Sequence, residues 1–377
     1  MFLTLFDEYM WSFNVMRLIS QAHFGGGQFS EIYETARRIE PGSVESWHAE
    51  WAALAERTGE RGAAAEAAGR DVSARSLYDR ACEYWRMADF MLPPSDARRL
   101  AAYERSLACF AAASRNAAHP RERVAVPFEG GSLPAYFIRG MGQAADEPRP
   151  TVVLFGGADS TAEELFFTAP GIWERGLACL IVDGPGQGGA LRLGGLPTRH
   201  DYEVPATAAV DFALTRADVD PDRLVMCAMS LGGYYTPRCA AMDSRYSAAI
   251  AWGAIWDYYE TWKKRIAKLK EAALPVPADH LLWACGVETY EQALGKLEGF
   301  RLEGVAEKVQ CPFLLMHGSE DAQVSMTDAQ KLFASIGSKD KTFRVFTAEE
   351  GGAQHCQRDY LTLAVDTVCD WLEQKFK

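Results

Sequence analysis

The sequence predicts an α/β protein, with a mostly parallel, doubly wound sheet preceded by a helical domain. Two observations predict this class. From about residue 121 onward, short apolar runs alternate with helix-like segments, as they do in βαβ units. Before that point the chain shows almost no strand-like alternation. We therefore expect an N-terminal helical domain at residues 1–117 and a sheet-containing domain at residues 118–377.

The N-terminal domain is rich in Ala, Glu, Arg and Trp, and its helices are expected between breaks made by Pro and Gly. These breaks are Pro41-Gly42, Gly59 and Pro93-Pro94. Trp47 and Trp51 are spaced as neighbours on one helix face and predict packing between helices. The expected helices span residues 30–39, 44–57, 63–91 and 95–113.

The second domain is expected to begin with a β-hairpin, because two strand-like runs, 123–128 and 133–138, flank Glu129-Gly130-Gly131. The interval 254–308 breaks the later alternation and is too long for a plain loop, so we expect a helical cap inserted over the carboxyl edge of the sheet. The other expected elements are strands at 151–155, 177–182, 224–227, 248–253, 312–316 and 342–346, with a helix at 200–215.

Charge and cysteine content exclude several classes of partner. The formal net charge is −12, from 39 basic and 51 acidic residues, which argues against nucleic-acid and anionic-membrane partners. The nine cysteines form no C-x-x-C pair and the seven histidines are scattered, so we expect no metal and no other cofactor. The apolar N-terminus carries Asp7 and Glu8 and is too short to span a membrane. A cytoplasmic protein is therefore expected.

The segment from Leu224 to Tyr235 has the pattern of a strand, a sharp turn and a helix. Ser230 stands at the turn, with Ala228 two residues before it and Gly232 two residues after it. A nucleophile placed this way adopts an unfavourable backbone angle, and bulky neighbours would collide across the turn. The pattern predicts that Ser230 is a nucleophile, although a buried junction of small residues would look the same.

A serine nucleophile needs a base, and the base needs an orienting acid. Asp321 follows the strand expected at 312–316, and His355 lies in a glycine-containing loop after the strand expected at 342–346. The chain order Ser, Asp, His is that of α/β-hydrolase triads, and all three residues follow strands at the sheet edge where sites are found. We therefore predict a catalytic triad of Ser230, Asp321 and His355.

An oxyanion hole needs two backbone N–H groups aimed at one point. The residue after the nucleophile, Leu231, is expected to supply the first. The strand at 151–155 runs into Gly156-Gly157-Ala158-Asp159, where glycines let the backbone approach a substrate. We predict Ala158 as the second donor with Gly157 as the alternative, and an ordinary glycine turn as the competing interpretation.

Beyond these motifs, nearly the whole chain resembles one group of α/β hydrolases. This group contains 2,6-dihydroxypseudooxynicotine hydrolase and the fungal yellowish-green-type hydrolases that shorten polyketides. The resemblance implies an α/β-hydrolase fold with the triad on the same three residues, and it departs from the group only at Ala228, where Gly is common. The residues that carry it are Gly25–Phe29, Glu45–Trp47, Trp51, Val72–Arg75, Tyr84–Arg86, Phe155–Glu164, Asp183–Gly188 and Ser230–Tyr235.

The resemblance implies hydrolysis of a carbon–carbon or ester-like bond beside a carbonyl in an aromatic or polyketide small molecule. A cyclase or acyltransferase on the same scaffold is the alternative, and a homodimer is left open. Asp257 or Glu260 would assist protonation of a carbon leaving group, or would form a salt bridge within the cap. The side chains expected to contact substrate are Asp159, Trp256, Asp257, Tyr258, Tyr259, Glu260 and Trp262.

Overall fold

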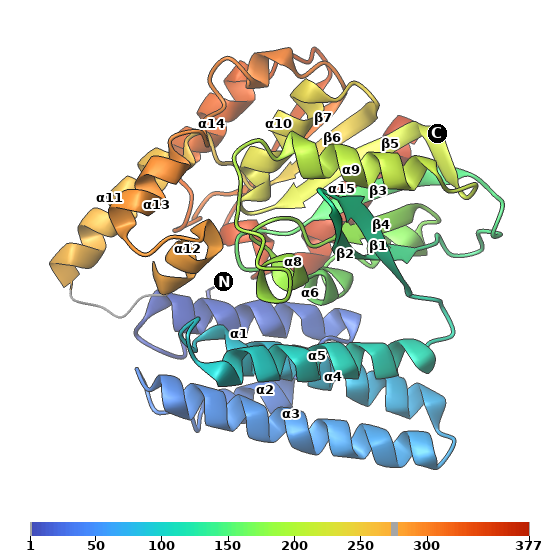
Figure 1. Cartoon of the computed structure of the whole chain (residues 1–377), viewed down its shortest axis with the longest axis vertical. Coiled ribbons are helices and arrows are strands. Elements are labelled where there is room, and N and C mark those ends of the chain that lie inside the picture. Colours follow the sequence, from blue (N-terminus) through green and yellow to red (C-terminus); the bar gives the residue numbers. More distant parts are fainter. Residues whose placement is uncertain (1, 273–277, 377) are drawn as a thin grey trace. The chain divides into compact units, whose positions relative to one another are not determined.

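The computed structural model describes residues 2–272 and 278–376, without the side chains of residues 268–272 and 278. It divides into two compact units (Figure 1). The first unit contains the chain up to Arg121 together with the short segments Phe166–Thr168 and Arg358–Thr362. The second unit contains Glu122–Leu165, Ala169–Gln357 and the segment from Leu363 onward. In the described part of the chain, no helix has both the length and the apolar character needed to cross a bilayer.

The first unit is helical, as the sequence predicts. Its elements are α1 (Tyr9–Gln21), η1 (Ala22–Phe24), α2 (Phe29–Ala36), α3 (Val44–Ala67), α4 (Asp71–Phe90) and α5 (Ala97–Arg115). The expected break at Gly59 is wrong, because α3 continues through it. Helix α1 has no counterpart among the expected helices. The expected long helix at 63–91 is also wrong, because the chain turns at Gly69, whose φ is +68°.

Packing between α3 and α4 explains why glycine does not end α3. A Cβ built at Gly62 would lie 3.0 Å from the ring of Tyr78 on α4. The missing side chain therefore lets the tyrosine ring lie against the α3 backbone. The predicted packing of Trp47 and Trp51 is confirmed, since both are fully buried in one cluster. The Trp47 indole N–H also donates to the carbonyl of Met87 at 2.6 Å.

The second unit contains an eight-stranded sheet in the order β1-β2-β4-β3-β5-β6-β7-β8. The strands β3 to β8 pair in parallel, and the hairpin β1–β2 joins them antiparallel at one edge. This confirms the expected doubly wound sheet and its opening hairpin. The strands are β1 (Glu122–Phe128), β2 (Gly131–Ile138), β3 (Arg149–Phe155), β4 (Ala178–Val182), β5 (Val219–Met229), β6 (Tyr246–Trp252), β7 (Phe313–Gly318) and β8 (Lys341–Phe346).

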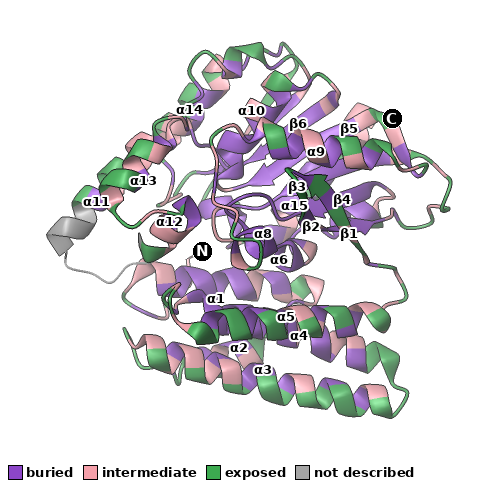
Figure 2. Cartoon of the chain, viewed as in Figure 1, coloured by how far each residue is buried: buried purple, intermediate pink, exposed green. Residues whose placement is uncertain are grey.

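Two features follow directly from the residues of these strands. The hairpin turn has positive φ at both Glu129 (45°) and Gly130 (80°), the backbone that two-residue hairpin loops favour. Strands β4 and β7 are buried along their whole length (Figure 2), which is typical of parallel strands covered on both faces. The carboxyl ends of the central strands therefore meet at one edge of a rigid, buried sheet.

Helices connect the strands of the second unit. The described part of the interval 254–308 holds the α-helices α11, α12 and α13 and the short helix η2, and its residues 273–277 lie outside the described residues. The helical character expected there is confirmed, whereas its role as a cap stays a prediction. The helical elements are α6 (Ala162–Phe166), α7 (Gly171–Glu174), α8 (Gly188–Arg192), α9 (Glu203–Leu214), α10 (Gly232–Met242), α11 (Tyr258–Ala272), α12 (Ala278–Cys285), α13 (Tyr290–Leu297), η2 (Ala306–Lys308), α14 (Met326–Ser335), η3 (His355–Gln357) and α15 (Leu361–Phe376).

Candidate active site

Ser230 stands at the sharp turn between β5 and α10, with a φ of +57°. A left-handed backbone at a residue other than glycine costs about 1–3 kcal/mol and persists only where the surroundings enforce it. A Cβ built at Gly232 would lie 2.4 Å from the Cβ of Ala228. The turn therefore has room for one methyl group between these two positions, and this chain places it at 228. The departure from Gly at that position is compatible with the turn for this reason.

The structure brings the three predicted triad residues together from three different strand ends. His355 Nε2 lies 2.8 Å from Ser230 Oγ, and His355 Nδ1 lies 2.7 Å from Asp321 Oδ2. The other carboxylate oxygen of Asp321 accepts the N–H groups of Gln323 and Val324 at 2.7 and 2.9 Å. These bonds hold the carboxylate in place through Oδ1 and leave Oδ2 available to orient the imidazole.

Burial and charge act against each other at the triad. Burial disfavours a charged His355, but the adjacent Asp321 carboxylate and the Cys356 side chain together raise the pKa of the imidazole above its ordinary value. Burial likewise opposes ionisation of Asp321, yet His355 and the Val324 N–H lower the pKa of its carboxyl. An ionised Asp321 would stabilise an imidazolium at His355, as the acid of a serine triad does. The hydrogen bonds assign Nδ1–H to the Asp321 side, which leaves Nε2 as the acceptor.

The loop after β3 passes directly beside the nucleophile. A Cβ built at Gly157 would lie 2.8 Å from the Cβ of Ser230. The Gly157 N–H donates to the hydroxyl of Ser160 at 3.0 Å, so it is already occupied. Among the described residues, no protein acceptor takes the N–H of Ala158 or of Leu231. The geometry therefore favours Ala158 over Gly157 as the second oxyanion donor.

Comparison with known proteins identifies the family. A model of the prolyl oligopeptidase family matches residues 166–377. The 20-hydroxy-prefusarin hydrolase of Gibberella moniliformis is 30% identical to this chain. The match covers 99% of this chain and 98% of that protein. The chain is an α/β hydrolase of this family. The α/β hydrolase ucsC of an Acremonium species is 36% identical to it over 285 residues, and this match covers 69% of our hydrolase and 57% of that protein.

Solved structures agree with this assignment. The crystal structure of 2,6-dihydroxy-pseudo-oxynicotine hydrolase superposes with a TM-score of 0.80 at 25% identity, and the match covers 94% of each chain. AbyA5 superposes with a TM-score of 0.69 at 20% identity and covers 93% of the hydrolase, which supports the fold alone. The resemblance to the group that contains 2,6-dihydroxypseudooxynicotine hydrolase is thereby confirmed.

The two acidic candidates on the inserted segment of the hydrolase both have structural partners. Asp257 accepts the N–H of Glu260 at 2.9 Å at the start of α11 and pairs with Arg301 at 3.2 Å. Glu260 pairs with Lys263 at 3.3 Å and is partly exposed. These contacts are those of a helix cap and a surface ion pair. They give neither carboxylate a contact with the triad.

The aromatic candidates of this segment pack mostly on one another and on nearby cations. The Tyr258 ring lies 6.2 Å from the ring of Trp262 and is buried. Burial raises the pKa of Tyr258 to about 12, and the nearby Asp159 carboxylate adds to this effect. Tyr259 lies under Arg301, and Trp256 under Lys331. Tyr258 is thus close enough to Asp159, in the loop beside Ser230, for that carboxylate to affect its pKa.

The inserted helices also contact both loops of the site. A ring nitrogen of His280, on α12, lies 2.9 Å from the carbonyl oxygen of Ala158. Arg265, on α11, donates to the carbonyl of Gln323 at 2.7 Å, two residues after the triad acid. The inserted segment is therefore positioned to hold two loops of the site. One is the loop after β3, which contains Ala158, and the other is the loop after β7, which contains Asp321 and Gln323.

Several residues at the site have no distinguishing sequence pattern. The Gln187 side chain contacts the loop after β3 through the carbonyl of Gly157, and the hydroxyl of Ser160 accepts the N–H of Gly157. His317, at the end of β7, is buried with its Nδ1 4.0 Å from Asp321 Oδ2, and burial lowers the pKa of its ring. A histidine directly after a buried strand is a weak signal, because a core histidine gives the same pattern. Ser160 and Gln187 lie in segments that carry the family resemblance, but their roles at the site are recognisable only through their tertiary contacts.

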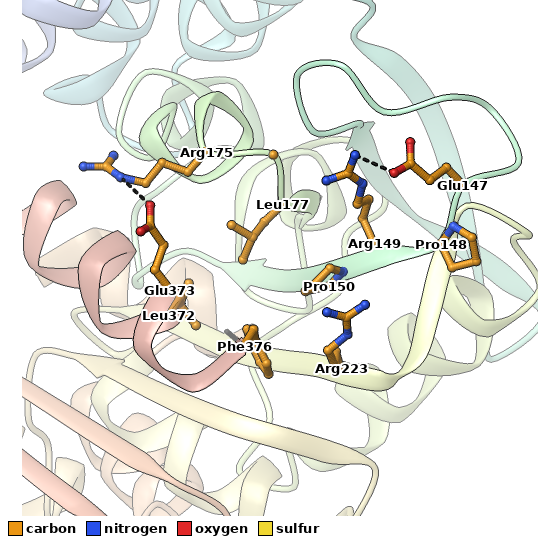
Figure 3. A pocket seen from close by; sticks show the side chains of 11 residues that line it. Glu147, Pro148, Arg149, Pro150, Arg175, Leu177, Arg223, Leu372, Glu373 and Phe376 are labelled. Carbon is orange, nitrogen blue, oxygen red and sulfur yellow. Dashed lines mark ion pairs between the residues drawn. The ribbon is translucent and has the colours of Figure 1, made fainter.

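A pocket of about 330 Å³ lies elsewhere in this unit (Figure 3). It is formed where β3 begins, with Arg149 and Pro150, and includes Arg175 and the end of α15. Arg149 pairs with Glu147 at 2.5 Å, and Arg175 with Glu373 at 3.6 Å. Because the triad follows the carboxyl ends of the strands, this pocket at an amino end is separate from it. No cluster of three or more His, Cys, Asp or Glu side chains in the described residues is arranged to hold a metal ion.

Proposed function

We propose that this hydrolase uses Ser230 as a nucleophile to cleave a carbon–carbon bond beside a carbonyl group in an aromatic or polyketide-derived small molecule. The observation that carries the proposal is the continuous hydrogen-bonded path from Ser230 through His355 to Asp321, with lengths of 2.8 and 2.7 Å. The names of two similar proteins support the substrate class, since they refer to a 20-hydroxy-prefusarin and a 2,6-dihydroxy-pseudo-oxynicotine.

In the first half of the reaction, His355 Nε2 takes the proton of Ser230 as Oγ attacks the carbonyl carbon. General-base help of this kind contributes roughly 10²–10⁴-fold to the rate. The N–H groups of Leu231 and Ala158 stabilise the oxyanion. The carbon–carbon bond then breaks, and its electron pair leaves as an enolate or an electron-rich aryl carbon. The His355 imidazolium protonates that carbon, which leaves an acyl group on Ser230.

In the second half, water replaces the serine. His355 takes a proton from the water as its oxygen attacks the acyl carbon, and the same two N–H groups hold the second oxyanion. The bond to Ser230 Oγ breaks, and the imidazolium returns its proton to the serine. The products are a carboxylic acid and the protonated leaving fragment. Asp321 stays ionised throughout and stabilises the imidazolium in both halves.

A cyclase or acyltransferase is the second candidate, because the same triad and oxyanion loop serve any acyl transfer. In that reaction a carbon or nitrogen nucleophile within the substrate replaces water at the acyl-enzyme. The two reactions differ in whether oxygen from water enters the product.

The test is product analysis by mass spectrometry in ¹⁸O-labelled water, with a panel of aryl 1,3-diketones and p-nitrophenyl acetate. We expect the diketones to be cleaved with higher kcat/KM than the ester, and the acid product to carry one ¹⁸O. Ser230→Ala is the matched control and should turn over neither class. A rearranged product without ¹⁸O would establish the cyclase instead. An ester turned over faster than every diketone would mark a carboxylesterase.

A further inference from the structure

The loop between β3 and α6 must be held in one conformation if Ala158 is to serve as an oxyanion donor. It contains Gly156 and Gly157, whose backbones rotate more freely than those of other residues. A donor is useful only if it is already aimed at the point where charge develops. The loop therefore needs outside support, and the structure shows where the support comes from.

The side-chain amide of Gln187 holds both glycines. Its Nε2 donates to the carbonyl of Gly156 at 2.6 Å and to the carbonyl of Gly157 at 3.0 Å. The carbonyl of Gly157 and the N–H of Ala158 belong to the same planar trans peptide, so they point in opposite directions. Fixing the carbonyl of Gly157 on the Gln187 side therefore aims the Ala158 N–H away from Gln187.

The orientation of the Gln187 amide is itself determined. Its Oε1 accepts the hydroxyl of Tyr202 at 2.7 Å and the N–H of Gly184 at 3.2 Å. Burial raises the pKa of Tyr202 well above its ordinary value, so the phenol stays protonated and donates. With both donors and both acceptor positions of the amide in use, a flipped amide would face three wrong partners, the carbonyls of Gly156 and Gly157 and the N–H of Gly184. Gln187 is almost completely buried, which makes such a loss costly.

The glycine at 184 lets this arrangement form. A Cβ built at Gly184 would lie 2.0 Å from the hydroxyl oxygen of Tyr202. Any larger residue would displace the hydroxyl that fixes the Gln187 amide. The segment Asp183-Gly184-Pro185-Gly186-Gln187-Gly188 thus brings one buried amide against the neighbouring loop.

We propose that Gln187 is the positioning residue of the oxyanion hole, and that it aims the Ala158 N–H by binding the carbonyls of Gly156 and Gly157. This inference rests on the proposed function, since it needs Ser230 to form an oxyanion. Tyr202 acts behind Gln187 by fixing its amide. Neither side chain touches the reacting atoms.

The test compares Gln187→Met with two matched tyrosine variants. Methionine keeps the length of the side chain and removes the amide. Tyr202 and Tyr235 stack on each other with ring centroids 3.5 Å apart and are both buried. The hydroxyl of Tyr202 contacts Gln187, whereas that of Tyr235 contacts Thr198 at 3.3 Å. Tyr202→Phe therefore disturbs the amide, and Tyr235→Phe controls for loss of a buried hydroxyl.

Three readouts separate positioning from folding. They are kcat and KM on p-nitrophenyl acetate, the rate constant for labelling of Ser230 by a fluorophosphonate, and Tm. Losing an oxyanion donor costs about 10²–10³-fold in kcat, so a misaimed donor in Gln187→Met should cost about 10–10²-fold in kcat and in labelling rate. KM and the pH midpoint of the reaction should stay close to those of the unmodified protein. Tyr202→Phe should give a smaller loss of the same kind, and Tyr235→Phe none.

The inference is overturned if Gln187→Met and Tyr202→Phe both label and turn over at the unmodified rate. It is also overturned if Tyr235→Phe loses as much as Tyr202→Phe, because the loss would then come from packing. If Gln187→Met fails to fold, the two tyrosine variants decide alone. Ser230→Ala separates failure of the positioning role from failure of the proposed function. Labelling that survives Ser230→Ala refutes the nucleophile, whereas Ser230-dependent labelling with no effect of Gln187 refutes only the positioning role.

Discussion

The two ends of the parallel strands present polar groups in opposite ways. At the carboxyl end the side chains of His355 and Asp321 are 5% and 1% exposed. At the amino end the pocket of Figure 3 is lined by Arg149 and Glu147, which are 34% and 41% exposed. Exposed ion pairs contribute at most about 1 kcal/mol, whereas buried polar groups depend strongly on their geometry. The pocket of Figure 3 is therefore a poor guide here, and the buried, strained and hydrogen-bonded edge at Ser230 is the better candidate for catalysis.

The sharpest way to break this comparison is to remove the nucleophile or the base. We expect Ser230→Ala and His355→Ala to lower kcat by similar factors of about 10⁶, since triad members act as one unit. The measurement is kcat on a substrate found in the diketone panel, with circular dichroism to verify folding. A loss confined to one of the two variants would contradict the shared mechanism.

The next effect concerns the orienting acid. Asp321→Asn keeps the shape of the side chain but no longer favours the productive tautomer and the imidazolium of His355. We expect kcat to fall by about 10⁴-fold, less than for Ser230→Ala. Asp257→Asn is the matched control, because Asp257 is a carboxylate bonded to a backbone N–H and to Arg301. If Asp257→Asn were the crippling change, the acid would come from the inserted segment instead.

The pH profile gives a third and smaller effect. His355 must be neutral to accept the Ser230 proton, so activity should rise with pH through the pKa of this imidazole. Asp321 raises that pKa, so the midpoint of kcat/KM should lie above the ordinary histidine value of about 6.5. In Asp321→Asn the opposing effect of burial remains, and the midpoint should move to lower pH. An unchanged midpoint would show that the carboxylate does not control the ring.

The smallest effect is expected at the amino end of the strands. Arg149→Gln removes a charge from the pocket of Figure 3 and breaks its pair with Glu147. We expect kcat/KM to be unchanged and the free energy of unfolding to fall by no more than about 1 kcal/mol, as for other exposed ion pairs. Urea denaturation and steady-state kinetics measure both quantities. A large loss of activity would mean that the pocket takes part in the reaction after all.

The meeting of the three triad candidates could be predicted because each residue has a local sequence signal and the fold brings the three together. Ser230, Asp321 and His355 each follow an apolar run, and parallel strands bring their carboxyl ends to one edge. The sheet and its hairpin follow from the same alternation. The contact of Gln187 with Gly156, 31 residues away, has no such signal, because it depends on how two irregular loops meet.

Helix boundaries show the same limit. Local propensity predicts a helix end at Gly59, but α3 continues to Ala67. Tertiary packing overrides propensity in this helix, since α3 packs on α4 on both sides of that position, with Gly59 facing Ala81 and Gly62 lying against the ring of Tyr78. The aromatic residues of the interval 254–308 show a related ambiguity. The length of the interval predicts helices correctly, but the sequence does not separate aromatic side chains that face a substrate from those that pair with Arg301 or Lys331.

The crowding between Ala228 and Gly232 also restricts how this turn can change during evolution. A methyl group at either position would occupy nearly the same space, since the two Cβ atoms would be 2.4 Å apart. A lineage that moves from Ala-x-Ser-x-Gly to Gly-x-Ser-x-Ala therefore cannot acquire the second alanine first. It must pass through a form with glycine on both sides of Ser230. The order of the two substitutions is thus set by the geometry of a single turn.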